Sequence, residues 1–367
     1  MTTDMVSHVA LQLVPGVGHN NAKYLISYCG SAEQVFTKTK KDLLRVPGIG
    51  EKSVTSILSK TTLATAEKIV SDCEKKNIRI LPYTSAEYPN RLKQLPDSPA
   101  TLFKTGNADL NALRTISVVG TRRATEYGKN ATELMLTGLR DYAPLVISGL
   151  AYGIDIEAHR HSLNLGMPTL GVLAGGLDKI YPKIHERIAR KMEENGGLIS
   201  ENPPGTQPDS HLFPARNRII AGLGDATVVI EAASKGGALI TANLADSYNL
   251  PVFAVPGNLD QEFSKGCNEL INKQKALIYT QTDDIVTYLN WDKEPTSNLP
   301  AQPDYSGLNE NEKKIVQLLA RQKEGYPIDE IAWKCQLQIN QLASLLLNLE
   351  FRGLIKSLPG KKYQLKS

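Results

Sequence analysis

The sequence predicts an α/β protein: a Rossmann-like, doubly wound, mostly parallel sheet, with an all-α domain before it and a winged helix after it. Seven short apolar segments alternate with helical segments between residues 115 and 280, as in repeated β–α units. Two copies of a Pro-Gly motif lie in the first 50 residues, and three amphipathic helices followed by two strands end the chain. We expect domains at residues 1–80, 81–290 and 307–367, with a linker at 291–306.

The N-terminal motif reads VPGVGHNNAKYLI from Val14 and VPGIGEKSVTSIL from Val46. In each copy the glycines allow a tight turn, and the turn opens a helix whose free N–H groups can face a phosphate. The doubled motif resembles a tandem helix-hairpin-helix (SAM-like) domain, a family of modules that bind DNA without sequence preference. Such pairs also serve in packing or protein contact, so both uses remain open.

The central region begins with residues 81–107, which are rich in proline and turn residues and are expected to extend the core with short elements. The core strands are expected as near-continuous apolar runs, because a parallel sheet is buried on both faces. They are TISVVGT (115–121), PLVISGLA (144–151), TLGVLAGG (169–176), GLISE (197–201), ATVVIEAA (226–233), PVFAVPG (251–257) and ALIYT (276–280).

The C-terminal region matches a winged helix, with helices expected in residues 308–322, 327–336 and 339–355 and two strands around a Pro-Gly turn. Most leucines of the third helix are expected in the core: Leu342, Leu345, Leu346, Leu347 and Leu349. The polar residues available for DNA are Gln338, Asn340, Gln341, and Lys356, Lys361 and Lys362 on the wing. DNA contact and protein contact are equally good interpretations of this domain.

Charge is unevenly distributed along the chain. Residues 1–80 hold 11 Lys or Arg against 7 Asp or Glu, residues 306–367 hold 10 against 6, and the middle holds 21 against 25. Basic ends suit a polyanion, although ordinary solvated faces would look the same. The sequence shows no long apolar run and no signal-peptide pattern, and its four cysteines are widely spaced. A reduced cytoplasmic protein without membrane attachment is therefore expected.

Candidate binding residues follow the predicted strands. Gly120, Thr121 and Arg122 end the first core strand, where backbone N–H groups and a guanidinium can hold a phosphate. Ser148 and Gly149 end the second, and Lys235 and Gly236 follow the fifth. Carboxyl ends of parallel strands share one edge of the sheet, so these residues are expected to meet.

The segment FPARNRII adds an aromatic residue and two arginines. Phe213 is expected just before a helix that begins near Arg216, with Arg216, Asn217 and Arg218 contacting nucleic acid and Phe213 stacking on a base. The alternative is that Phe213 is buried and that Arg216 and Arg218 pair with acids such as Glu201.

Common catalytic signatures are missing from the sequence: it contains no H-E-x-x-H, G-x-S-x-G, C-x-x-C, G-x-G-x-x-G or P-loop pattern. His159 and His161 lie two residues apart, on different helix faces, so we expect no metal site from them. Ser148, Asp155 and His159 contain the residue types of a catalytic triad, but no feature of the sequence positions them, and Asp155 is better explained as a helix cap. We expect no cofactor, no metal and no catalysis.

Seven segments together resemble the DNA-processing protein A family (DprA, also called Smf): SVVGTRRAT, ISGLAYGIDIEAHRHSL, GGLDKIYPKIH, GLISENPPGTQP, FPARNRIIAGL, KGGALITA and VFAVPGNLDQEFSKGCNELI. The resemblance implies a non-enzymatic homodimer that binds single-stranded DNA without strong sequence preference. It further implies protection of incoming strands during natural transformation, loading of RecA and opposition to single-strand-binding protein. By the family pattern, Gly120–Arg122 line the DNA pocket and Phe213–Ile220 supply further contacts, whereas Lys235 matches less securely.

The core also resembles, more distantly, Rossmann-like hydrolases of nucleoside 5′-monophosphates. Those carry P-G-G-x-G-T-x-x-E, whose glutamate is catalytic. Here SKGGALITANLAD keeps the glycine pair but lacks the proline, the G-T and the glutamate. A nucleotide-binding or nucleotide-hydrolysing protein therefore remains the alternative, disfavoured because no base would face the glycosidic carbon.

Overall fold

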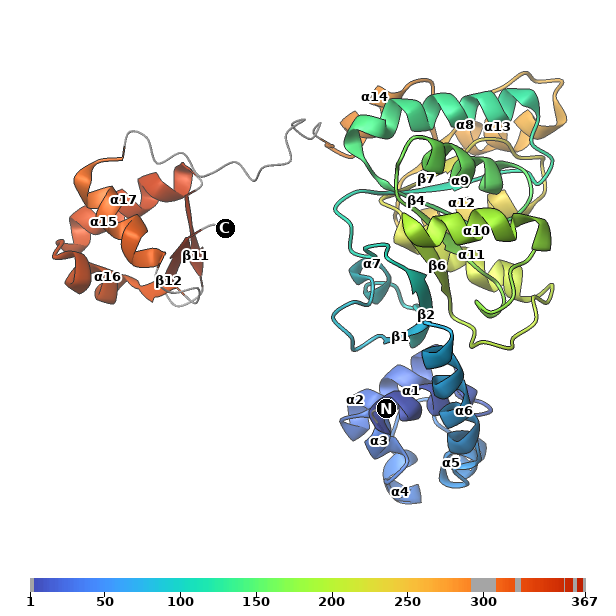
Figure 1. The fold of residues 1–367 in the computed structure, drawn as a ribbon, viewed down its shortest axis with the longest axis horizontal. Coiled ribbons are helices and arrows are strands. Elements are labelled where there is room, and N and C mark those ends of the chain that lie inside the picture. The colour runs from blue at the N-terminus through green and yellow to red at the C-terminus, as the bar shows by residue number, and fades with distance from the viewer. Residues whose placement is uncertain (1–2, 292–307, 321–324, 353, 359–361, 366–367) are drawn as a thin grey trace. The chain divides into compact units, whose positions relative to one another are not determined.

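The computed structural model describes residues 3–291, 308–320, 325–352, 354–358 and 362–365. The chain divides into two compact units, residues 1–294 and residues 295–367, and each is described by itself (Figure 1). Among the described residues, no helix is long and apolar enough to cross a membrane. The four cysteines are buried and free.

The first unit is built on a nine-stranded sheet in the order β1-β2-β6-β5-β4-β3-β7-β8-β9. All seven predicted core strands are present, and neighbouring pairs among them are parallel. Their bounds are β3 Thr115–Val119, β4 Leu145–Ser148, β5 Thr169–Val172, β6 Gly196–Ser200, β7 Ala226–Val229, β8 Val252–Ala254 and β9 Leu277–Ile278. The predicted Rossmann-like, mostly parallel core is confirmed.

The strand order reverses at β3. From there the chain moves through β4 and β5 to β6 on one side, then returns to β7 beside β3 and continues outward to β8 and β9. The loops after β3 and β7 therefore leave neighbouring strands toward opposite sides, which opens a crevice at their carboxyl ends. Both carry residues that the sequence singled out.

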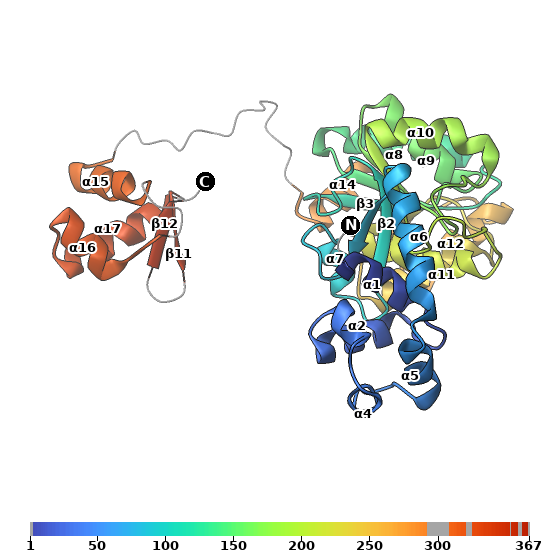
Figure 2. The ribbon, with the colours of Figure 1, turned by 60° about the horizontal axis from the view of Figure 1, so that its bottom comes forward.

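Helices cover both faces of the sheet (Figures 1 and 2). One face packs against α8 (Glu126–Leu139), α9 (Ile154–Asn164), α10 (Glu186–Glu194) and α14 (Thr282–Tyr288). The other packs against α7 (Asn90–Lys93), α11 (Leu212–Leu223), α12 (Gly237–Ser247) and α13 (Lys265–Asn272). Alternation within the strands divides the core: Val146 of β4 faces the first set, whereas Leu145 and Ile147 face the second. Short 3₁₀ turns η1 (Arg140–Tyr142), η2 (Lys183–His185) and η3 (Glu262–Ser264) complete the loops.

The expected extension before the core forms two strands at one end of the sheet that the sequence did not indicate. β1 (Arg79–Pro82) pairs with β2 (Thr101–Gly106), which pairs with β6, and both pairings are antiparallel. β1 begins at Arg79 and so crosses the boundary expected at residues 80 and 81.

The N-terminal residues form the predicted helix-hairpin-helix pair, with helices α1 Thr3–Leu13, α2 His19–Cys29, α3 Ala32–Val35, α4 Lys40–Leu43, α5 Glu51–Leu58 and α6 Thr61–Lys75. Gly16 and Gly48 each take a positive φ, 80° and 76°, where a side chain would be strained. The two turns are tied reciprocally, because Ser53 donates to the carbonyl of Gly16 and Asn21 donates to that of Gly48, both at 3.3 Å. One apolar cluster joins these helices to the sheet, with Leu25 and Val54 in the same cluster as Phe103 and Leu198.

The second unit is a winged helix, as predicted. Its elements are α15 Glu310–Leu319, β10 Tyr326–Pro327, α16 Ile328–Cys335, α17 Ile339–Phe351, β11 Ile355–Leu358 and β12 Lys362–Leu365. Leu342, Leu346 and Leu349 are fully buried, but Leu347 is 51% exposed and does not belong to the core. The Pro-Gly turn, Lys361 and nearly all of the expected linker lie outside the described residues.

Candidate nucleic-acid interface

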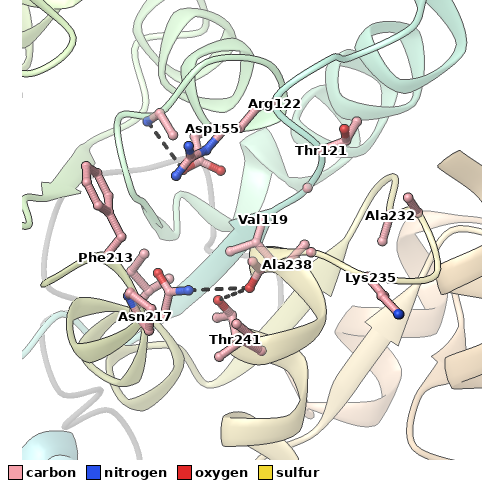
Figure 3. A pocket seen from close by; sticks show the side chains of 18 of the residues that line it. Val119, Thr121, Arg122, Asp155, Phe213, Asn217, Ala232, Lys235, Ala238 and Thr241 are labelled. Carbon is pink, nitrogen blue, oxygen red and sulfur yellow. Dashed lines mark hydrogen bonds between the residues drawn. The ribbon is translucent and has the colours of Figure 1, made fainter. Parts of the chain in front are cut away.

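A cavity of about 640 Å³ opens where β3 and β7 end, at the reversal of strand order (Figure 3). We call it the strand-end cavity. Most of its wall comes from the loops after β3 and β7, the first turns of α11 and α12, and η3. Together with Val119 at the end of β3 and Asp155 in the first turn of α9, the lining includes Gly120, Thr121, Arg122, Phe213, Pro214, Arg216, Asn217, Lys235, Gly236, Gly237, Thr241, Glu262 and Phe263, among others. Phe213 and Lys235 lie on opposite sides of it in Figure 3.

The loop after β3 is held by its backbone. Thr121 donates its N–H to Glu231 O at 2.8 Å and accepts from the N–H of Ile154 at 3.1 Å. Gly120 is required here, because a Cβ would collide with the side chain of Ile154. Arg122 is exposed, and its guanidinium lies 5.4 Å from the ring centre of Phe213. Arg122 is thus a cation at the rim of the cavity that is stacked on an aromatic ring.

Helix α11 begins at Leu212, so Phe213 lies within its first turn rather than before the helix, which corrects the expected start near Arg216. The proline at 214 is tolerated there because N–H groups of the first turn need no helical partner. Phe213 is half-buried rather than buried, and it packs edge-on against Tyr181 at 5.9 Å. Asn217, one turn later, donates to Gly237 O at 3.4 Å and joins α11 to α12.

Arg216 forms part of the cavity floor and is only 4% exposed. Its guanidinium donates to the carbonyl of Gly149 at 2.6 Å and to that of Val172. Burial lowers its pKa to about 10, and the carboxylate of Asp155 opposes this shift, so Arg216 stays protonated at neutral pH. Its Nε has no hydrogen-bond partner among the described residues. Arg216 therefore ties α11 to β4 and β5 and supplies positive charge from below, rather than as an extended side chain.

Arg218 does not line the strand-end cavity. It pairs with Glu201 at 2.5 Å, as the alternative interpretation had it, and Glu201 also accepts from Nε2 of His19 at 2.8 Å. Burial alone would raise the pKa of Glu201, but the hydrogen bonds and charges of His19 and Arg218 outweigh it and lower the pKa. Arg218 thus joins α11 to the N-terminal helices, and its role is structural in this geometry.

Two other predicted residues support the cavity from behind. Ser148 is fully buried and donates to Val118 O at 2.6 Å. Gly149 lies against the guanidinium of Arg216 and lines a small neighbouring cavity together with Lys179 and Tyr181. Lys235 and Gly236, in contrast, are exposed, line the strand-end cavity and precede α12. The free N–H groups of the first turn of α12 face this region.

The sequence analysis missed two aromatic residues: Phe263, which lines the strand-end cavity, and Tyr181, which lines the small neighbouring cavity. Each follows a Gly-rich strand end, Tyr181 after β5 and Phe263 after β8. An aromatic residue in such a loop was the available signal.

The expected lack of a catalytic triad can be tested on geometry. Nδ1 of His159 bonds the hydroxyl of Thr169 at 2.7 Å, and Ser148 is directed at a backbone carbonyl. Burial lowers the pKa of His159 to about 3. These contacts do not join Ser148 to His159. In the part of the chain that the structure describes, no group of three or more His, Cys, Asp or Glu is placed to hold a metal ion.

Comparisons with known proteins agree over nearly the whole chain. Residues 79–290 match the family described as DNA recombination-mediator protein A, residues 299–361 the DprA winged helix domain, and residues 9–61 the SAM-like helix-hairpin-helix tandem. Protein Smf of Synechocystis sp. is 30% identical over 97% of both chains. DNA processing protein DprA of Bacillus subtilis is 37% identical over 59% of this chain and 73% of its own length.

Solved structures of DNA processing protein A are among those similar to this chain. The X-ray structure of DNA processing protein A from Streptococcus pneumoniae aligns with a TM-score of 0.67 at 29% identity, over 78% of this chain and 98% of that one. A structure of DNA processing protein A from Helicobacter pylori, described for its single-stranded DNA binding mode, aligns with a TM-score of 0.53 at 28% identity, over 59% and 97%.

Proposed function

Since the chain belongs to the DNA recombination-mediator protein A (DprA/Smf) family, we propose that it binds single-stranded DNA in the strand-end cavity, without sequence preference and without catalysis. The observation that carries this proposal is the stacked pair of Arg122 and Phe213 at the rim, in the same cavity as the exposed Lys235, which lies on the side opposite Phe213. An aromatic ring accepts any base, and the cations bind any phosphate.

Different parts of the cavity wall suit different parts of a nucleotide. Arg122 and Lys235 are exposed cations that can approach phosphates, and the N-terminal turn of α12 adds N–H groups. Phe213 offers its ring to an unpaired base. In duplex DNA the bases are already stacked on one another, so none is available to stack on Phe213. The site should therefore prefer single strands.

The alternative, a nucleotide-hydrolysing enzyme, is less well supported. The carboxylates lining the cavity are those of Asp155 and Glu262. Asp155 is buried, faces Arg216 and accepts from the N–H of Ala151 at 3.4 Å, so it is engaged in holding the fold. Release of free base from a nucleoside monophosphate, abolished by a cavity substitution, would establish the alternative.

The wider role proposed here follows from the family. The protein protects incoming strands in the cytoplasm, loads RecA onto them during natural transformation and opposes single-strand-binding protein. A homodimer through the core is part of this proposal. It is supported by β9, which is the outermost strand of the sheet among the described residues and whose Leu277 and Ile278 are 41% and 50% exposed. Ile278→Lys should then shift the mass measured by light scattering from dimer to monomer.

The experiment that tests the DNA site is fluorescence anisotropy with labelled oligo-dT, single-stranded against duplex, across a salt series. Wild type should bind the single strand more tightly, with affinity that falls as salt rises. Arg122→Ala should weaken binding about tenfold or more and reduce the salt slope by about one. Arg140→Ala is the matched control, since Arg140 is exposed on η1, at the start of the loop that enters the opposite end of the sheet. Equal binding by the Arg122 and Arg140 variants would move the site elsewhere.

A further inference from the structure

A second cavity, of about 600 Å³, adjoins the strand-end cavity. Glu262 and Phe263 of η3 line both. The remaining wall of the second cavity is Thr125, Tyr127, Glu231, Pro256, Gly257, Asn258, Gln261 and Ser264. η3 is therefore a partition, with one cavity on each side.

The partition repeats the chemistry of the rim. Arg123, the residue after Arg122, places its guanidinium 5.3 Å from the ring centre of Phe263, as Arg122 does at 5.4 Å from Phe213. Both arginines are exposed, and the two rings belong to different elements. Consecutive arginines thus build two stacking platforms, and both rings line the strand-end cavity.

This second platform is fixed by the backbone. The carbonyl of Phe263 accepts the N–H of Ala232 at 2.7 Å, and the N–H of Arg123 donates to Thr121 Oγ1 at 3.2 Å. Behind them, the carboxylate of Glu231 accepts from the N–H and the hydroxyl of Thr125, at 2.9 and 2.5 Å. Loops after β3, β7 and β8 are thereby joined, so little ordering remains to be done when a ligand binds.

The lining of the second cavity suits a base and not a phosphate. It contains no Lys or Arg, and it includes the carboxylates of Glu231 and Glu262. The amides of Asn258 and Gln261 are exposed at its edge and offer both donors and acceptors. A neutral base stacked at Phe263 meets no like charge there, and its phosphate can remain near Arg123.

We propose that a single strand bound in the strand-end cavity continues across Arg123 and Phe263, and that a second unpaired base occupies the adjoining cavity. This inference rests on the proposed function and extends it, because it gives the strand a direction along the edge of the sheet, from Phe213 on α11 to Phe263 on η3.

The test compares oligo-dT of increasing length on wild type and on paired variants. Phe263→Leu keeps an apolar side chain but removes the ring, and Phe263→Tyr keeps the ring; Arg123→Lys keeps the charge but loses the planar stacking group. We expect Phe263→Leu to weaken the binding of long oligonucleotides about 5- to 100-fold, which is the usual cost of losing one stacked base. The affinity for the shortest oligonucleotide that binds should be unaffected. Phe263→Tyr should bind long oligonucleotides with an affinity close to that of wild type. In wild type, 5-iododeoxyuridine at successive positions should photocrosslink to α11 and to η3.

The two proposals fail in different ways. Wild-type binding that Arg122→Ala weakens, while Phe263→Leu and Arg123→Lys bind every length like wild type and no crosslink reaches η3, would overturn the second base site alone. Binding that Arg122→Ala leaves unchanged would overturn the strand-end site, and with it this extension.

Discussion

Arg122 and Arg216 both line the strand-end cavity, yet one is exposed at its rim and the other is buried in its floor. Arg122 stacks on Phe213, with its guanidinium open to solvent. Arg216 donates to carbonyls after β4 and in β5 and lies near Asp155. Two arginines of one cavity therefore differ in their expected function: we expect the rim to bind DNA and the floor to hold the rim in place. Substitutions should separate them.

The largest effect should come from the floor. Arg216→Met should lower the free energy of unfolding by about 3–5 kcal/mol, because it leaves the carboxylate of Asp155 and two carbonyls buried without their partner. Urea unfolding of the Arg216 and Arg122 variants would measure this, with Arg122→Ala expected to match wild type. Similar urea midpoints for the Arg216 and Arg122 variants would contradict the distinction between floor and rim.

The second-largest effect is expected at acid pH, where the buried His159 should lower the free energy of unfolding. Burial lowers the pKa of His159 from 6.5 to about 3, so the unfolded chain binds more protons in this range. The contribution of His159 to the free energy of unfolding is therefore complete above pH 6.5 and is lost as the pH falls toward 3. At pH 5 the loss from this residue alone should be about 2 kcal/mol. Unfolding free energies from pH 7 to 5 would show it. His159→Gln should have a shallower slope than wild type, whatever its stability at pH 7, and identical slopes would contradict this origin.

At the rim, the effect should be on binding. Phe213→Ala should weaken oligo-dT binding by about 1–3 kcal/mol, the cost of one lost stacking contact, with the melting temperature close to that of wild type. Phe213→Tyr should retain most of the affinity because it keeps an aromatic face. If the alanine variant instead lost stability and kept its affinity, Phe213 would belong with the floor.

The smallest effect should come from the link to the N-terminal helices. Nδ1 of His19 accepts from the N–H of Ala100 at 3.3 Å, and Nε2 donates to Glu201, which holds Arg218 on α11. His19→Gln can keep the donor to Glu201, whereas His19→Asn can keep the acceptor for Ala100. We expect the asparagine variant to lose about 1 kcal/mol more, since the buried Glu201 then keeps its pair with Arg218 but loses the donor that His19 supplied. Hydrogen exchange in α11 should rise only in that variant.

Most of the fold could be predicted from local patterns in the sequence. Apolar runs of strand length, separated by helical periods, specify a parallel sheet because only such runs can be buried on both faces. Paired glycines specified the two hairpin turns, as the positive φ of Gly16 and Gly48 shows. Strand ends located the region of the cavity through the common direction of parallel strands. Strands β1 and β2 were not predicted, because their short, proline-flanked segments look like irregular chain.

Only the tertiary structure decided which polar residues of the motifs face the cavity. Arg216, Asn217 and Arg218 are consecutive, but successive residues of a helix point about 100° apart, so Arg216 reaches the floor, Asn217 the first turn of α12, and Arg218 the carboxylate of Glu201. The ring that pairs with Arg123 lies at position 263, 140 residues further along the chain. Contacts between residues so far apart depend on strand order and helix rotation, which no local pattern encodes.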